Sequence, residues 1–466
     1  MSIFNPFSDK DVIHDLKSAA PNAELITDAD SLAKQASDSN SIIKSTDSLI
    51  AFVKVTDEND IKGVLKVARK YHLPVIPKTT GSSIVAGSNA IENGILISTE
   101  KMNHILKVDA NDQLAVVQPG VINNELNQAA NKVGMLYAPD PGSRTFSSIG
   151  GNTNTNAGGA SALRYGTTKD SVLALTVILA DGREIHVGTD TYKNSFGYDL
   201  THLFVGAEGT LGIVTEITVK LFPIPLGKSI AGAAVFKDLD TLNEAATAVR
   251  KSGAYPSLMQ AFDANILGAI DKLKQTNYLK DGHAMLIVKV DGSNEQVKSA
   301  LSKIFNQYNG KQIQLSDEPA EVKNIAGLAM AMFPAIYSDQ NSQFFMSDLT
   351  VPLSQSTNLI QSIDQLGHEL SINVFTAAYV GDGTVHPIIG WPKSAKAVPE
   401  NVVQMVKAIY HKTIELNGTI TGEYSVGMLK NQWVNQQLGA EADYLQQQIK
   451  SLLDPMHLLN PKRKIN

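Results

Sequence analysis

The chain contains no cysteine, which excludes disulfides, thiolate metal sites and cysteine nucleophiles. The first residues lack the basic start and the long apolar core of a secretory signal peptide. Long apolar runs are absent too, since the longest, Val172–Ala180 and Ala326–Tyr337, are too short to span a bilayer. The second run fits a buried helix or a surface that touches a membrane. We therefore expect a cytoplasmic protein with at most peripheral membrane contact.

Basic residues are slightly outnumbered by acidic ones. Forty Lys and Arg residues face 46 Asp and Glu residues, which gives a net charge of −6. Basic residues gather only at Lys462, Arg463 and Lys464, so the chain has no run of the kind that tracks phosphates, and we expect no nucleic-acid partner. With 466 residues, the chain is too long to fold around one hydrophobic core, and we expect two or three domains.

The first part of the chain opens with strand and helix patterns. Leu49–Val55 reads as a strand, residues 57–72 carry a helical apolar face, and Pro74–Pro77 reads as a second strand. Asp181–Gly182 indicates a hairpin turn. Further short strands are predicted at Gly94–Ser98, Ala115–Gln118, Val172–Ala180, Arg183–Val187 and Ile213–Phe222.

The composition changes near residue 226, where glycine becomes rarer. Strands are predicted at Ser229–Phe236, Ala284–Val290, Phe344–Val351 and Asn373–Tyr379. Helices are predicted at Leu239–Ser252, Glu295–Tyr308 and Gln355–Leu366, and mostly helix after residue 400. The alternation indicates an antiparallel sheet with helices on one face, an α+β domain.

Two segments, Lys78–Gly87 and Ser147–Gly159, are rich in Gly, Ser, Thr and Asn. Consecutive small residues let backbone N–H groups converge on one point, and such nests bind phosphates. The alternative is two ordinary surface loops. Neither segment matches the P-loop or the Rossmann glycine pattern.

Several long motifs carry a resemblance to a known family. They are PVIPKTTGSS, PDPGSRTFSSIGGNTNTNAGG, RYGTTKD and GYDLTHLFVGAEGTLGIVTEITVKL, followed later by GDGTVH and ITGEYSVG. In this order they resemble the FAD-linked oxidases with a flavin domain of the vanillyl-alcohol-oxidase type. The branch is that of FAD-dependent D-lactate, glycolate and D-2-hydroxyglutarate dehydrogenases, and the likeness covers residues 45 to 461.

The resemblance implies an α+β fold with three parts. Residues 1–225 would form a two-subdomain FAD-binding domain, and residues 226–400 an α+β cap domain with an antiparallel sheet. Residues 401–466 would form a helical segment that returns to the flavin site. The implied function is hydride transfer from the α-carbon of a small D-2-hydroxy acid to flavin N5.

By the same resemblance, FAD would be bound by small and polar residues. No Cys exists and no His lies in the two glycine-rich segments, so we expect non-covalent FAD. The implied cofactor residues are Pro77, Lys78, Thr79, Thr80, Gly81, Ser82, Ser83, Pro139, Gly142, Ser143, Gly150, Gly151, Asn152, Asn154, Gly158, Tyr165, Gly166, Glu208, Gly209, Gly212, Ile213, Val214 and Asn460.

The catalytic motifs depart from the pattern of the branch. The branch usually shows HxGDGNxH, whereas this chain reads YVGDGTVH, with Tyr379 in place of the first His and His386 retained. The branch also shows GEHG, whereas this chain reads GEYSVG, with Glu423 retained and Tyr424 in place of the base His. The substrate hydroxyl needs a base with a pKa near the working pH.

Two alternatives remain for that base. In the first, Tyr424 is the base, and it would need a nearby cation to lower its pKa from about 10. In the second, Tyr379 and Tyr424 only form hydrogen bonds and pack beside the flavin, and His386 is the base. Two metal ligands of the branch remain, His386 and Glu423, while Tyr379 replaces the third. A catalytic zinc site usually has three protein ligands, so we expect no divalent metal.

The substrate pocket of the branch commonly offers an arginine to the substrate carboxylate. The matching stretch here, NIAGLAMAMFPAIYSD, contains none. The absence of this arginine allows a less acidic substrate, an alcohol or a phenol, as an alternative to D-lactate or glycolate. The sequence names neither the electron acceptor nor the oligomeric state, and a homodimer stays open.

Overall fold

A computed structural model of the chain describes residues 7–39 and 42–465. It divides the chain into two compact units. The first unit comprises the described residues up to Gly159, then Thr167–Ile224 and the chain from Glu423 on. The second comprises Ala160–Gly166 and Pro225–Gly422. The domain limits expected from the sequence, at residues 225 and 400, stay a prediction.

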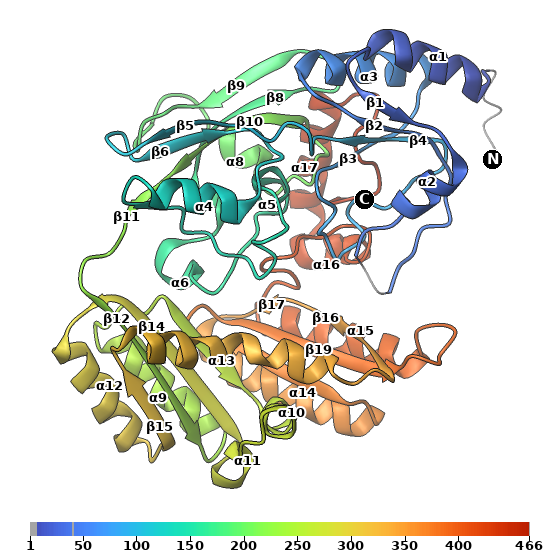
Figure 1. Cartoon of the computed structure of the whole chain (residues 1–466). Coiled ribbons are helices and arrows are strands. Elements are labelled where there is room, and N and C mark those ends of the chain that lie inside the picture. Colours follow the sequence, from blue (N-terminus) through green and yellow to red (C-terminus); the bar gives the residue numbers. More distant parts are fainter. Residues whose placement is uncertain (1–6, 40–41, 466) are drawn as a thin grey trace. The chain divides into compact units, whose positions relative to one another are not determined.

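A four-stranded sheet begins the first unit, with the strand order β1-β2-β4-β3 (Figure 1). Both β2 and β3 pair in parallel with β4, which confirms the strand–helix–strand pattern of the sequence. The apolar face of α3 packs on this sheet together with α1. The bounds are α1 (Asp9–Ala19), β1 (Glu24–Ile26), α2 (Ala29–Gln35), β2 (Leu49–Lys54), α3 (Glu58–Tyr71), β3 (Val75–Lys78) and β4 (Gly94–Ser98).

A second sheet of the same unit is antiparallel, with the order β5-β6-β10-β8-β9. Strands β8 and β9 form the hairpin that Asp181–Gly182 predicts. The bounds are β5 (Ile105–Asp109), β6 (Leu114–Val117), α4 (Asn123–Asn131), β7 (Met135–Leu136), α7 (Thr168–Ser171), β8 (Val172–Ile178), β9 (Glu184–Gly188), α8 (Thr201–Phe204), β10 (Ile213–Lys220) and β11 (Phe222–Pro223).

The glycine- and asparagine-rich stretch is not a continuous loop, because Ile149–Thr155 forms helix α5. The loop reading is therefore wrong for these residues. The Ser148 side chain caps the helix by accepting from the Gly151 N–H, and the N–H groups of Ile149 and Gly150 donate to Val121 and Pro119. These bonds satisfy donors that a helix start leaves open, and so offset the poor helix propensity of glycine.

The chain after Glu423 belongs to the first unit. Residues Leu458 and Leu459 pack into the core of the four-stranded sheet, and Val75 at the start of β3 exchanges backbone hydrogen bonds with Leu458 and Asn460. This late segment therefore extends the edge of β3, just before Pro77–Ser83. The helices here are η2 (Asn431–Trp433), α16 (Val434–Leu438) and α17 (Ala440–Leu453).

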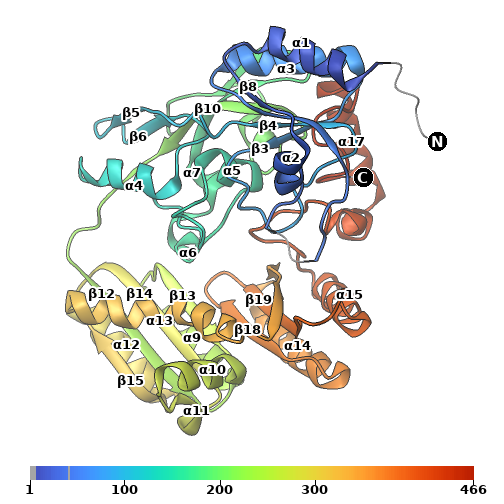
Figure 2. The same cartoon turned by 45° about the vertical axis from the view of Figure 1, so that its right-hand side comes forward.

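The second unit is built on one antiparallel sheet with the order β15-β12-β14-β13-β18-β19-β16, and β17 also pairs with β19 (Figure 2). Its strands are β12 (Lys228–Phe236), β13 (Leu258–Phe262), β14 (Ala284–Ser293), β15 (Lys311–Ser316), β16 (Ser342–Met346), β17 (Leu349–Thr350), β18 (Val374–Tyr379) and β19 (Thr384–Pro392). Its helices are α6 (Ala162–Tyr165), α9 (Leu239–Lys251), α10 (Ala264–Lys274), α11 (Tyr278–Asp281), α12 (Glu295–Gln307), α13 (Pro319–Tyr337), η1 (Leu353–Gln355), α14 (Ser356–Leu370) and α15 (Glu400–Glu415).

Helices cover both faces of this sheet, so the prediction of one covered face is wrong. Ala231, Ala233 and Val235 of β12 share a core with α13. The next residue, Phe236, points to the opposite face and meets Phe305 of α12 edge to face, because successive side chains of a strand alternate. Small residues in β12 hide from sequence inspection that both of its faces are buried.

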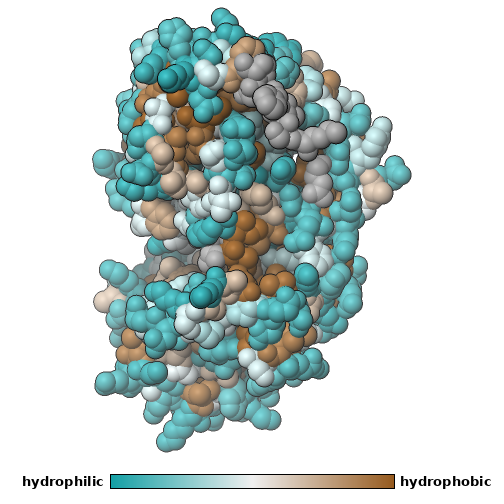
Figure 3. Space-filling view, turned by 90° about the vertical axis from the view of Figure 1, so that its right-hand side faces the viewer, coloured by the Kyte–Doolittle hydropathy of each residue, from teal (hydrophilic) through white to brown (hydrophobic). Residues whose placement is uncertain are grey.

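Helix α13 contains the apolar run Ala326–Tyr337 and packs on the sheet, as the buried-helix alternative predicts. Among the described residues, no helix is long and apolar enough to cross a membrane. Hydrophilic side chains cover much of the face in Figure 3, with apolar side chains gathered in places. The strand predicted at Phe344–Val351 is interrupted by the buried polar residues Ser347 and Asp348.

Candidate active site

The first glycine-rich segment follows β3. Lys78 donates to Gln35 at 2.8 Å, and the Thr79 and Thr99 hydroxyls bond at 3.0 Å. Burial lowers the pKa of Lys78. Within residues 7–39 and 42–465, no hydrogen bond uses the N–H groups of Gly81, Ser82 and Ser83. Half-exposed loop residues with uncommitted N–H groups fit the pyrophosphate of a dinucleotide.

Helix α5 supplies buried polar atoms to the second segment. Asn152 is 3% exposed, and its Nδ2 has no hydrogen-bond partner among the described residues; the same holds for Oγ1 of Thr153. Buried donors of this kind normally have a partner, so a cofactor acceptor fits there. In contrast, the backbone of Gly150 packs on Pro119, and Gly212 packs on Val177 of β8. Close packing against the protein therefore explains the need for glycine at these two positions without a cofactor.

The other implied cofactor residues come from several parts of the chain. Asn123 donates to the carbonyl of Pro139. A Cβ at Gly142 would meet open space, and one at Gly209 would meet Pro77. Ile213 and Val214 begin β10 and are buried. Tyr165 ends α6 and Gly166 follows it, and both belong to the second unit as part of the segment Ala160–Gly166.

Glu423 lies directly against Gly158. A Cβ at Gly158 would stand 2.8 Å from Cγ of Glu423 and 2.9 Å from its Oε1. Only glycine leaves the space that this carboxylate occupies. The structure therefore brings a predicted catalytic residue against a predicted cofactor segment.

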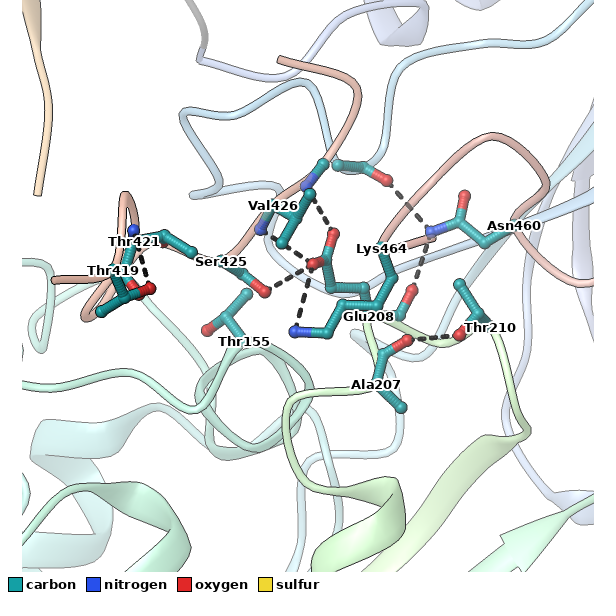
Figure 4. A network of polar contacts seen from close by, with 12 residues as sticks. Thr155, Ala207, Glu208, Thr210, Thr419, Thr421, Ser425, Val426, Asn460 and Lys464 are labelled. Carbon is teal, nitrogen blue, oxygen red and sulfur yellow. Dashed lines mark hydrogen bonds and ion pairs between the residues drawn. The ribbon is translucent and has the colours of Figure 1, made fainter. Parts of the chain in front are cut away.

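Glu208 is the centre of a polar network (Figure 4). Its carboxylate accepts hydrogen bonds from the Ser425 hydroxyl at 2.6 Å and from the N–H groups of Val426 and Gly427 at 2.9 and 2.7 Å. Asn460 donates to the carbonyl of Glu208 at 2.7 Å. The side chain of Glu208 is thus engaged by the loop that follows Glu423 and Tyr424.

The second unit brings Tyr379 and His386 together. Their rings meet edge to face, with centroids 5.2 Å apart, because the two residues lie on the paired strands β18 and β19. His386 is 3% exposed, and its Nδ1 lies 3.1 Å from the carbonyl oxygen of Ser347. A carbonyl only accepts, so Nδ1 carries the proton and Nε2 of the neutral ring is an acceptor.

Tyr410 completes this buried group, with its hydroxyl 3.3 Å from that of Ser347. Burial raises the pKa of Tyr410, and it raises the pKa of Asp382 in the turn between β18 and β19. Sequence reasoning did not single out Ser347 or Tyr410. A polar residue inside a predicted strand was the available signal for Ser347.

Arg250 is a second residue that sequence reasoning missed. Its guanidinium donates to the carbonyl of Val380 and to the Thr247 hydroxyl, which ties the end of α9 to the residue after Tyr379. The stretch that lacks the arginine of the branch lies in α13. In the part of the chain that the structure describes, no three His, Asp or Glu side chains gather as a metal site.

Comparisons with known proteins agree with this fold. A family model described as an FAD binding domain matches residues 50–188, and one described as the C-terminal domain of FAD linked oxidases matches residues 228–463. The glycolate oxidase subunit GlcD of Bacillus subtilis is 32% identical over 414 residues, 88% of each chain. A D-lactate dehydrogenase of Archaeoglobus fulgidus is 31% identical over 419 residues, 89% of this chain and 90% of that protein.

Among solved structures, 4-ethylphenol oxidase from Gulosibacter chungangensis in an isoeugenol complex superposes with a TM-score of 0.78. It is 16% identical, and the match covers 98% of this chain and 96% of that chain. At this identity the likeness establishes the fold alone. The sequence matches, together with the uncommitted N–H groups after β3 and the buried polar atoms of α5, lead to one conclusion: the chain belongs to the family of FAD-linked oxidases and has FAD as its cofactor.

Proposed function

We propose that the protein oxidises a small D-2-hydroxy acid of the D-lactate or glycolate type to the 2-oxo acid, with non-covalent FAD. The two relatives named for these substrates are 31–32% identical and span nearly nine-tenths of the chain. The observation that carries the proposal within this chain is His386, a buried imidazole whose Nδ1 faces a carbonyl. It supports a base at Nε2.

FAD, when bound, supplies the acceptor for the hydride that leaves the substrate α-carbon. His386 takes the hydroxyl proton at Nε2, and the carbonyl of Ser347 stabilises the resulting imidazolium through Nδ1. The N–H groups of Gly81, Ser82 and Ser83 would hold the cofactor phosphates, and Asn152 would donate to the cofactor. Glu423 and Tyr424 would contact substrate through hydrogen bonds, with Tyr424 as the alternative base.

The tyrosines and the missing arginine favour a second candidate, oxidation of a less acidic alcohol or phenol. Tyr379 and Tyr424 stand where the branch has histidines, and α13 contains no arginine. A tyrosine hydroxyl brings no positive charge to pair with a carboxylate, so these residues suit a substrate that has none. The 4-ethylphenol oxidase match supports only the fold, so it does not favour this candidate.

The deciding measurement is anaerobic flavin reduction with D-lactate, glycolate, L-lactate and 4-ethylphenol. We expect D-lactate or glycolate to bleach the flavin band rapidly and with saturation. If 4-ethylphenol alone does so, the hydroxy-acid proposal is wrong and the second candidate replaces it.

The role of His386 predicts the behaviour of His386→Gln. Loss of a general base lowers the reduction rate by roughly 10²- to 10⁴-fold, while the bound FAD per chain stays unchanged. His368→Gln, at an exposed histidine of α14, is the matched control and should reduce at the wild-type rate. Unchanged reduction in His386→Gln would assign the base to another group, with Tyr424→Phe as the next variant.

A further inference from the structure

Glu208 lies in the AEGTLG motif, where the resemblance implies a cofactor contact. We propose instead that Glu208 is a positioning residue: its carboxylate clamps residues 425–427 and so fixes the loop that carries Glu423 and Tyr424. The effect on turnover rests on the proposed function, whereas the clamp itself does not.

The carboxylate is already occupied by protein donors. Oε1 accepts from the Ser425 hydroxyl and the Val426 N–H, and Oε2 accepts from the Gly427 N–H. Lys464 Nζ lies 3.9 Å from Oε1. The residue is 7% exposed. Charge-assisted bonds of this kind are strong, and a carboxylate so engaged has little capacity left for a ligand, least of all an anionic one.

The main chain of Glu208 is fixed as well. Its N–H donates to the carbonyl of Asn154 in α5 at 2.8 Å, and its own carbonyl accepts from Asn460. Its φ is +56°, a conformation that side chains other than glycine adopt at a cost, and that persists only where the surroundings determine it. The clamp is therefore held in place relative to both α5 and the late chain segment.

The loop is held firmly at its far end too. Gly427 has a φ of +54° and its backbone lies on the carbonyl of Val85, which also accepts from the N–H groups of Met428 and Leu429. On the near side, Glu423 rests on Gly158. Glu423 and Tyr424 thus lie between two fixed points, and the bonds to Glu208 set the backbone immediately after them.

Three variants test the clamp. Glu208→Gln keeps the size of the side chain but removes the charge and turns an amide toward the N–H donors. Ser425→Ala removes one of the three bonds without touching Glu208. Glu216→Gln, on the neighbouring strand β10, is the matched control.

The first readout needs no substrate. Hydrogen exchange of peptides that contain Val426 and Gly427 should accelerate in Glu208→Gln, and less in Ser425→Ala, while Glu216→Gln exchanges like the wild type. The dissociation constant of FAD, measured by flavin fluorescence, should change less than about twofold, because a cofactor ligand would have shown a larger loss.

The second readout is flavin reduction by the substrate that the panel identifies. Misplacement of catalytic groups by about 1 Å costs on the order of 10²-fold, so the limiting rate should fall roughly 10- to 100-fold in Glu208→Gln. The pH at half-maximal rate should also shift, since Tyr424 and Glu423 move. The double variant that combines Glu208→Gln with Ser425→Ala should reduce the flavin no more slowly than Glu208→Gln alone, because both changes act on the same clamp.

Weakened FAD binding in Glu208→Gln with unchanged exchange at Val426 and Gly427 would overturn the proposal and make Glu208 a cofactor residue. If Glu208→Gln fails to fold, Ser425→Ala decides, and unaltered exchange and rate in that variant overturn the proposal as well. If no 2-hydroxy acid reduces the flavin but exchange accelerates as expected, the proposed function fails while the clamp stands.

Discussion

At the scale of single residues, the hydrogen-bond partners of His386 and Glu208 come from distant parts of the chain. His386 and Glu423 were selected by motif, but the carbonyl that sets the tautomer of His386 comes from Ser347, 39 positions earlier. The partners of Glu208 lie 217 to 219 positions away. Such partners depend on how the chain folds back, and no local spacing encodes them.

Asp263 provides a residue-scale prediction, because burial raises the pKa of its carboxyl to about 7 against the usual 3.8. It accepts from the N–H groups of Ile266 and Thr376, which oppose the shift without cancelling it. Between about pH 4 and pH 7 the folded state keeps a proton that the unfolded state releases. The free energy of unfolding therefore falls as pH rises, by at most about 1.4 kcal/mol per pH unit.

The measurement is the urea midpoint of the second unit at pH 5, 6, 7 and 8. The midpoint should fall from pH 5 to pH 7 in the wild type, and this fall should vanish in Asp263→Asn. Asp281→Asn, at an exposed position in α11, serves as the control that keeps the fall. A midpoint that rises with pH would show that the N–H donors outweigh burial.

At the scale of elements, the strands and helices that the sequence predicts mostly agree with the structure to within a few residues, whereas α1, α10, β13 and β19 carry no prediction. The predictions are wrong where glycine and alanine dominate. The composition of Ile149–Thr155 predicts a loop where the structure has helix α5, and the small residues of β12 conceal that both of its faces are buried. Both errors have one cause: small side chains carry little hydrophobic signal, while bonds to distant backbone, such as Gly150 to Pro119, determine the conformation.

Helix α17 gives the element-scale prediction. Lys450 is buried, and its Nζ donates to Asp454 at 2.5 Å and to the carbonyls of Thr210 and Leu459 at 2.7 and 2.8 Å. Lys450→Met would leave Asp454 buried without its cation, which costs about 3–5 kcal/mol. Chemical unfolding of the first unit should show a loss of this size.

Gln448→Met, at an exposed position of the same helix, should unfold like the wild type. Lys450→Met combined with Asp454→Leu should recover part of the loss, because the unpaired charge is gone. If Lys450→Met alone were as stable as the wild type, water would have replaced the ammonium group beside Asp454.

At the scale of the whole molecule, the family and the α+β fold were predicted by motif order, and the comparisons confirm both. The composition does not predict how the chain is divided between the two units. Residues 160–166 belong to the second unit, whereas the chain on either side of them belongs to the first. A short excursion of this kind leaves no compositional mark.

Separate hydrophobic cores in the two units predict two unfolding transitions with different ligand dependence. The implied phosphate contacts after β3 lie in the first unit, so FAD at 100 times its dissociation constant should stabilise the transition of that unit by about 2.7 kcal/mol. Calorimetry of the FAD-depleted protein, with and without added FAD, measures this. The transition of the second unit, which is identified by the pH dependence that Asp263 confers, should shift less on addition of FAD. Equal shifts of the two transitions would contradict separate cores.

The bridge between Val75 and Leu459 also sets an order of events during protein synthesis. Translation delivers β3 early, yet its neighbour at the sheet edge, and Asn460 that holds Glu208, are made only after residues 225–422. The second unit therefore emerges with nearly all of its sequence before the first unit can close. We therefore expect FAD to bind only after residue 460 has left the ribosome, and a nascent chain halted earlier to lack bound flavin.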